Sequence, residues 1–224
     1  MKKKLSNIIN LCFIPILFVL LLWVVKGIEI TMENNFSHLG LISKNRDSLI
    51  NILTFPLVHA GEVIPSFMSY KDFEHLINNS LPLILLGSII STVYRNISNQ
   101  VFLLSYLFSG GILWIIGNPN ENVIGASGVV YALASFIVFS GFIRKDPRLS
   151  ILSFLIIFIY GNSIFWGMMP MPNDVSWEGH LSGFIAGLIL SMIFKNKGPR
   201  QKKYLWEIEE ELEDEKIKNL DFES

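Results

Sequence analysis

The chain has 224 residues, of which 51% are apolar and only 17% are charged. A soluble domain of this length rarely carries so little charge, so the composition favours a polytopic membrane protein. The formal net charge of −1 argues against a nucleic-acid binder, because no basic face is left to meet phosphates.

The first apolar run, from about residue 8 to 25, follows the basic sequence Met-Lys-Lys-Lys at residues 1–4. This arrangement is similar to a signal peptide, but the run is too long and no small-residue cleavage site follows it. It is interpreted as a retained transmembrane helix. Its Cys12 is the only cysteine, so the sequence predicts neither a disulfide nor a paired-cysteine metal site, and Cys12 is interpreted as a small packed apolar side chain.

Six stretches are long and apolar enough to span, or nearly span, a hydrocarbon core of about 30 Å. They cover roughly residues 7–26, 74–94, 100–117, 127–143, 149–167 and 180–195. The sequence therefore predicts an all-α integral membrane protein with six transmembrane helices.

Basic residues in the short connections set the predicted orientation, because lysine and arginine concentrate on the cytoplasmic side. The basic residues of that side are Lys2, Lys3, Lys4, Arg95, Arg144, Lys145, Arg148, Lys195, Lys197, Arg200, Lys202 and Lys203. The loops near 118–126 and 168–179 contain neither lysine nor arginine. Both termini are predicted to be cytoplasmic. The helices that begin near residues 127 and 180 then start on the extracytoplasmic side.

The first extracytoplasmic loop, predicted from about residue 27 to 73, is long and carries basic residues that its acidic residues balance. Its segment 49–67 is apolar but is broken by Pro56 and Pro65. This composition favours an interfacial or partly inserted hairpin over a seventh span.

The composition changes after Gly198-Pro199, where Glu, Asp and Lys predominate. We therefore expect a membrane-embedded domain over residues 1–197 and an acidic cytoplasmic tail over 198–224. A short solvated or surface-lying helix is the expected state of the tail, and a partner-binding element is the alternative.

The sequence Gly-Ala-Ser-Gly at 125–128 stands where an extracytoplasmic loop enters a predicted membrane helix. Small residues are also common where membrane helices pack closely, so the match alone is weak evidence for a nucleophile at Ser127. No strand pattern precedes it, which argues against the nucleophile elbow of an α/β-hydrolase.

His180 stands at the start of the last predicted span, in Gly-His-Leu-Ser-Gly at 179–183. Ionisable groups at membrane depth are costly and mark functional sites by default, although a histidine at a loop end can also simply be satisfied by a backbone carbonyl. Gly183 and Gly187 share the helix face of His180 and permit close approach of another helix. If that helix begins at Ser127, the imidazole can reach the hydroxyl and act as its base.

His75 and Asn79 are four residues apart and point to one face of the second span. As donors they could stabilise an oxyanion together with the N–H of Ser127. His59 is a weaker candidate for the same region, and His38 is interpreted as ordinary loop.

A serine–histidine dyad is the predicted arrangement, because no Asp or Glu lies at the depth where it would orient His180. Glu178 and Asp174, in the neighbouring loop, stay open as alternatives. Tyr131, one turn after Ser127, is the expected platform for the imidazole ring.

These motifs together resemble the rhomboid family of intramembrane serine proteases, over about residues 7–195. The resemblance rests on the sequence Gly-Ala-Ser-Gly-Val-Val-Tyr-Ala-Leu at 125–133, on the pair His75 and Asn79, and on 179–187. It implies Ser127 as nucleophile and His180 as general base.

The resemblance also implies His75, Asn79 and the main chain near Ser127 as the oxyanion site. Tyr131 would stack beneath the imidazole of His180, and Gly125 would let the loop dip into the protein.

Two features depart from the family pattern. Tyr70 stands where a second histidine is common, and His59 is either its displaced replacement or unrelated. A Trp-Arg pair found in the first loop of some members is absent. Both departures concern the first loop, and with it the substrate preference.

The expected activity is cleavage of transmembrane segments of other membrane proteins near the extracytoplasmic face, with transmembrane substrates and the lipid bilayer as partners and no nucleic acid, metal or cofactor. A mobile gate is expected at the fifth span and the loop 168–179. A bacterial inner membrane fits the sequence, and an organelle membrane would look similar. The alternatives are a relative that binds membrane proteins without cutting them, and a transporter or channel, for which no inverted repeat is visible.

Overall fold

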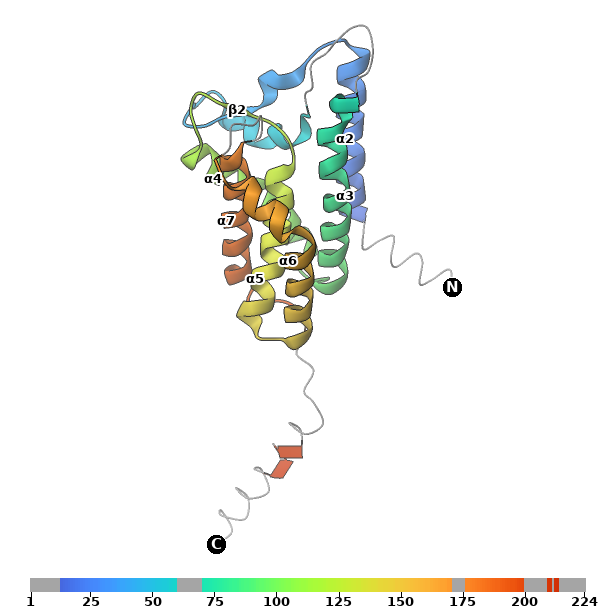
Figure 1. Ribbon diagram of the computed structural model, residues 1–224, viewed down its shortest axis with the longest axis vertical. Helices are drawn as coiled ribbons and strands as arrows, with labels where there is room; N and C mark the ends of the chain where they lie inside the picture. Colours follow the sequence, from blue (N-terminus) through green and yellow to red (C-terminus); the bar gives the residue numbers. More distant parts are fainter. Residues whose placement is uncertain (1–12, 60–69, 171–175, 200–208, 211, 214–224) are drawn as a thin grey trace, which may run out of the picture.

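The computed structural model describes residues 13–59, 70–170, 176–199, 209–210 and 212–213. Six long helices dominate this part of the chain and run alternately up and down the bundle (Figure 1). They are α2 (Phe13–Thr31), α3 (Tyr70–Val93), α4 (Ser98–Ile116), α5 (Ser127–Arg144), α6 (Pro147–Gly167) and α7 (Trp177–Ile193).

Five of these helices, α2 to α6, are long and apolar enough to cross a membrane. The sixth, α7, is apolar but has 17 residues. At 1.5 Å per residue it measures about 25 Å, somewhat less than a hydrocarbon core of about 30 Å. The chain is thus a helical, multi-pass integral membrane protein, as its composition predicts.

The end of the first helix differs from the predicted one. The predicted span covers roughly residues 7–26, but α2 continues to Thr31. Lys26 and Glu29 lie three residues apart on the helix and form an ion pair of 3.4 Å, with side chains 5% and 2% exposed. Because the two charges face the bundle interior and pair with each other, they do not end the helix. The predicted start of this span lies outside the described residues.

Helix α5 is the centre of the bundle and packs against α3, α4, α6 and α7. Its contact with α7 is the most extensive, and two glycines of α7 allow it. A Cβ at Gly183 would collide with the carbonyl oxygen of Gly128, and one at Gly187 would lie 2.7 Å from the backbone nitrogen of Phe136. The close helix approach expected from the spacing of these glycines is present, and its partner is the helix that begins at Ser127.

The first loop folds over one end of the bundle, where α5 and α7 begin (Figure 1). Its short elements are η1 (Phe36–Leu39), β1 (Leu41–Ile42), η2 (Leu49–Leu53) and η3 (Phe55–Leu57). The Tyr106 hydroxyl of α4 donates to the Leu53 carbonyl at 2.6 Å, and the Trp114 indole donates to the Asn45 carbonyl at 2.9 Å. The expected hairpin over 49–67 stays a prediction, because residues 60–69 lie outside the described part.

A two-residue strand pair joins this loop to the one before α5, and the sequence did not predict it. Strand β1 pairs antiparallel with β2 (Asn122–Val123), with Leu41 opposite Val123. The Asn122 side chain also donates to the Ser37 carbonyl at 2.6 Å. The pair is too short for a sheet with an α/β-hydrolase elbow, but it fixes the segment that leads into Ser127.

At the opposite end, Arg144 of α5 donates to the carbonyls of Lys195 and Pro199, each at 2.6 Å. These bonds hold the chain that leaves α7 against the end of α5. Of the predicted tail beyond Pro199, the structure describes residues 209–210 and 212–213, which are helical. The domain boundary and the state of the tail stay predictions.

Substitution of Gly187 by alanine is expected to destabilise the bundle. The added methyl would press on the backbone of Ala132 and Phe136, and overpacking of this kind costs about 1–3 kcal/mol. The matched control is Gly111→Ala in α4, where a Cβ meets nothing within 4 Å. Thermal unfolding in detergent should show a lower Tm for Gly187→Ala only. Equal Tm values for the two variants would contradict the close packing of α5 and α7.

Candidate active site

Ser127 is the first residue of α5, and the backbone before it makes a sharp entry into the helix. Gly125 has a φ of +105°, a value that glycine adopts far more readily than other residues. The Ala126 carbonyl then accepts hydrogen bonds from the N–H groups of Val129 and Val130, at 2.9 and 3.1 Å. The Ser127 side chain, partly exposed, therefore stands at the positive end of the helix dipole of α5.

The N–H groups of this entry turn have different partners. The Gly125 N–H donates to the Phe55 carbonyl at 2.9 Å, and the Ala126 N–H donates to His59 Nε2 at 3.2 Å. The N–H groups of Ser127 and Gly128 make no hydrogen bond to any described residue. The first N–H available to an incoming oxygen atom is therefore that of Ser127 itself.

His180 lies in the first turn of α7, which Ser176 caps by accepting a hydrogen bond from the Gly179 N–H at 3.2 Å. Its ring is buried and stacks on the ring of Tyr131, with centroids 4.2 Å apart and planes inclined by 7°. The Tyr131 hydroxyl donates to the Ser163 carbonyl of α6 at 2.9 Å. The stack expected from the sequence is therefore present, and α6 holds it from the other side.

The protonation of the imidazole follows from its second contact. His180 Nδ1 lies 2.8 Å from the Gly167 carbonyl oxygen, which can only accept a hydrogen bond. Nδ1 therefore carries the proton in the neutral ring, and the lone pair is on Nε2. Nε2 makes no hydrogen bond to a described residue. This is the tautomer that a general base requires.

Ser127 and His180 occupy the first turns of two helices whose backbones touch nearby. A Cβ at Gly128 would lie 3.2 Å from the Gly179 carbonyl oxygen. The Ser127 hydroxyl itself makes no hydrogen bond to a described residue, so the hydroxyl–imidazole contact is not closed. Catalytic hydrogen bonds are often long without substrate and tighten only when it binds.

The sequence left open whether Glu178 or Asp174 orients the His180 ring. Glu178 accepts a hydrogen bond from the Ser176 hydroxyl at 3.3 Å, and the Nδ1 proton of His180 goes to Gly167 instead. Asp174 lies outside the described residues. Among the described residues no group of three His, Cys, Asp or Glu side chains is placed to hold a metal ion.

His75 and Asn79 lie in the first part of α3, and His75 lies beside the entry turn of α5. The His75 ring packs on Gly125 so closely that a Cβ there would lie 2.6 Å from His75 Cε1. The buried Asn79 amide donates to the His75 carbonyl at 3.0 Å, which leaves its second N–H for another acceptor. The structure thus brings His75 next to the backbone that precedes Ser127.

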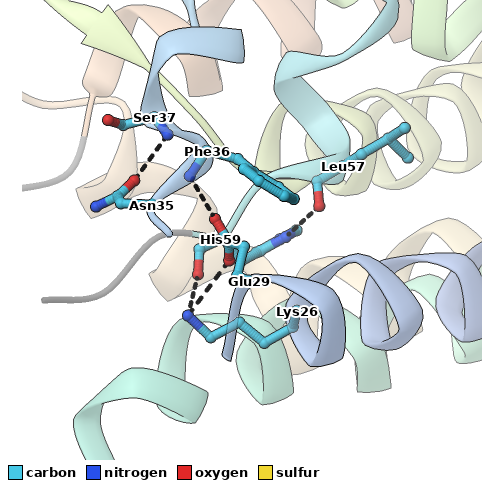
Figure 2. A network of polar contacts seen from close by, with 7 residues as sticks. All are labelled: Lys26, Glu29, Asn35, Phe36, Ser37, Leu57 and His59. Carbon is cyan, nitrogen blue, oxygen red and sulfur yellow. Dashed lines mark hydrogen bonds and ion pairs between the residues drawn. The ribbon is translucent and has the colours of Figure 1, made fainter. Parts of the chain in front are cut away.

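His59, expected only as a weak candidate, is directly bonded to this backbone. Its ring is 1% exposed, and its centroid lies 5.0 Å from that of His75. Burial, then the neighbouring charges of His75 and Lys26, lower the pKa of His59 from 6.5 to about 3, against the opposing effect of the Leu57 carbonyl. Figure 2 shows the Leu57 carbonyl contact at Nδ1 and the Lys26 contact at the His59 carbonyl.

Sequence reasoning missed the groups that orient these side chains, which are the main-chain carbonyls of Phe55, Ser163 and Gly167. A backbone carbonyl has no residue-type signature, so no motif announces it. Gly167 carried one signal, namely a glycine at the end of an apolar helix. A Cβ there would collide with the Tyr131 hydroxyl and lie 2.9 Å from His180 Nδ1.

Comparison with known proteins shows similarity to one domain family, to bacterial proteins and to a mouse protein. The model of the Rhomboid domain matches residues 47–197. Uncharacterized protein Rv1337 of Mycobacterium tuberculosis is 29% identical over 185 residues, which are 79% of this chain and 72% of that protein. Uncharacterized protein ML1171 of Mycobacterium leprae is 29% identical over 185 residues, 79% of this chain and 68% of that protein. Rhomboid-related protein 2 of Mus musculus is 24% identical over 193 residues, 81% of this chain and 60% of that protein.

Acid is expected to destabilise the protein through His59. The folded-state pKa is about 3 and the ordinary value is 6.5, so the unfolded chain binds a proton that the folded chain refuses. The stability from neutral His59 is fully present above pH 6.5 and is lost as the pH falls toward 3. Thermal unfolding between these pH values should show a smaller decrease in Tm for His59→Gln than for wild type. The exposed His38→Gln should follow wild type, and equal decreases in all three proteins would refute the assignment.

Substitution of Gly167 by alanine is expected to displace the His180 ring, because the methyl would occupy the space beside Nδ1 and the Tyr131 hydroxyl. Nitrogen-15 NMR of the histidine rings should show loss of the hydrogen-bonded Nδ1 proton. The control is Gly161→Ala in the same helix, where the new Cβ would make an ordinary contact of 3.4 Å with Ile157 Cγ2. An unchanged His180 signal in Gly167→Ala would contradict the role of this carbonyl.

Proposed function

The chain belongs to the rhomboid family, and we propose that it is an intramembrane serine endopeptidase that uses Ser127 and His180. The observation that carries this proposal is the state of the His180 ring. Its Nδ1 proton is donated to the Gly167 carbonyl, and its face is stacked on Tyr131. Its Nε2 makes no hydrogen bond to a described residue, at the end of the bundle where α5 begins.

In the first step, Ser127 Oγ attacks the carbonyl carbon of the scissile peptide bond and forms the new C–O bond. His180 Nε2 takes the hydroxyl proton, and the resulting imidazolium keeps its Nδ1–H on the Gly167 carbonyl. A carbonyl here serves the orienting function that a carboxylate serves in a triad.

The carbonyl oxygen of the substrate becomes an oxyanion in this step. The proposed donors are the N–H of Ser127, which has no partner among the described residues, the second N–H of the Asn79 amide, and the His75 ring beside Gly125. The positive end of the α5 dipole adds to their field.

The intermediate then collapses. The imidazolium gives its proton to the leaving amine as the C–N bond breaks, and an acyl-enzyme stays on Ser127. A water molecule, deprotonated by His180 Nε2, attacks the ester, and the acid product leaves as the proton returns to Ser127 Oγ.

The proposed substrates are transmembrane segments of other membrane proteins, cleaved near the extracytoplasmic face. The supporting features are a polar site at one end of a bundle whose helices are apolar, and the predicted orientation with both termini in the cytoplasm. Water and substrate would enter from the extracytoplasmic side.

A second candidate function is binding of membrane proteins without cleavage. The observation that favours it is the absence of a hydrogen bond between the Ser127 hydroxyl and any described residue. The dyad residues, the tautomer of His180 and the Ser127 N–H, which has no partner among the described residues, favour the protease.

Cleavage of a transmembrane test substrate in liposomes should depend on both dyad residues. We expect Ser127→Ala and His180→Ala to lower kcat by about 10⁶-fold. A serine-reactive fluorophosphonate should label wild type and not these variants. Matched controls are Ser88→Ala, in the middle of α3, and His38→Ala, exposed in the first loop, and both should cut and label like wild type. A folded wild-type protein that neither cuts nor labels would favour the binding function.

A further inference from the structure

Helix α2 contains a pair of charges that the proposed reaction does not use. The side chains of Lys26 and Glu29 are almost completely buried and lie 3.4 Å apart. Figure 2 shows their contact. Burying two charges costs several kcal/mol per ion, and ionisable residues in membrane helices are rare unless they have a function. A role in holding the helix bundle alone would be met as well by apolar side chains.

Each member of the pair also binds the backbone of the first loop. Lys26 Nζ donates to the His59 carbonyl at 3.2 Å, and Glu29 Oε1 accepts the Phe36 N–H at 3.0 Å. Phe36 begins η1, shortly after α2, and His59 follows η3 at the far end of the described loop. One turn of α2 therefore holds both ends of the segment 36–59 (Figure 2).

The same segment holds the turn before Ser127. The carbonyl of Phe55 accepts the Gly125 N–H, and His59 Nε2 accepts the Ala126 N–H. Two consecutive donors are thus fixed by two residues of one short stretch of chain. The next N–H along the chain is that of Ser127, the first one without a partner in the described part of the chain.

The bonding of the His59 ring defines its role. Because Nε2 accepts a hydrogen bond, the proton of the neutral ring is on Nδ1, which faces the Leu57 carbonyl at 3.4 Å. A ring in this state has no N–H directed to the reaction centre. The sequence left open whether His59 contributes to the oxyanion site, and the hydrogen bonds exclude direct donation.

We propose that His59, anchored by the buried Lys26–Glu29 pair, is a positioning residue that aims the Ser127 N–H at the oxyanion of the substrate. The inference rests on the proposed protease activity. Its chain of contacts runs from the ion pair to the His59 backbone, from the His59 ring to the Ala126 N–H, and from there to Ser127. The ring remains an acceptor as long as it is neutral, and burial keeps it so.

Two substitutions of His59 separate its acceptor atom from its packing. His59→Phe keeps a ring against His75 but leaves the Ala126 N–H without a partner. His59→Gln places an amide oxygen near the position of Nε2 and can still accept. His38→Phe, in the exposed part of the same loop, is the matched control.

We expect His59→Phe to lower kcat by up to about 100-fold with little change in KM, since a small misplacement of a catalytic group has an effect of this size. His59→Gln should recover most of the lost kcat, and His38→Phe should match wild type. Hydrogen–deuterium exchange of the segment 125–130, measured by mass spectrometry in detergent, should be faster in His59→Phe only.

The double variant Lys26→Met/Glu29→Gln tests the anchor without leaving one buried charge unpaired. It should accelerate exchange in the segment 125–130 as His59→Phe does. Normal exchange in this variant would overturn the anchoring function of the ion pair.

The positioning inference is overturned if His59→Phe has wild-type kcat and wild-type exchange. It is also overturned if His59→Gln loses as much as His59→Phe, because then restoring the acceptor atom does not restore the activity. Ser127→Ala is assayed in parallel. If it cuts as well as wild type, the protease proposal fails, whereas the exchange rates still decide whether His59 holds the turn.

Discussion

The close backbone contact of α5 and α7 is the constraint on which the rest of the structure depends. The face of α7 that carries Gly183 and Gly187 lets its backbone reach that of α5, and Gly128 at the start of α5 meets the first turn of α7. A side chain at Gly183 would push the helices apart and separate Ser127 from His180. Helix association in lipid has no hydrophobic driving force, so van der Waals contact between closely packed helices has to stabilise the bundle, and small residues allow that contact.

A polar site inside an apolar bundle also needs a partner for each of its polar groups. Here main-chain carbonyls provide most of them, with Gly167 for His180, Ser163 for Tyr131 and Phe55 for Gly125. A carbonyl orients an imidazole without adding a second charge at membrane depth, where charges are expensive. The one buried ion pair described, on α2, is held within its own turn and by the first loop.

The sequence predicted the features that side-chain type determines, and it missed those that depend on backbone geometry. The helical spans, the stack of His180 on Tyr131 and the packing glycines follow from hydropathy and from spacing along a helix. The predicted end of α2 was wrong, because two charges three residues apart neutralise each other and face inward. The strand pair β1–β2 and the carbonyl of Gly167 have no compositional signal. The chemical roles of Ser127, His180, His75 and Asn79 stay predictions, for which the structure gives positions and hydrogen bonds.

Helix α6 has two opposite properties that bear on how substrate reaches the site. Its buried residues, Leu149, Ser153 and Ile156, all lie in its first half, so its second half is held mainly at its end. That end supplies the carbonyls that bind Tyr131 and His180. A gate at this helix, as the sequence led us to expect, therefore cannot open at its last turn without releasing the imidazole. Either the opening is confined to the middle of α6, or the movement that admits the substrate also changes the orientation of the His180 ring.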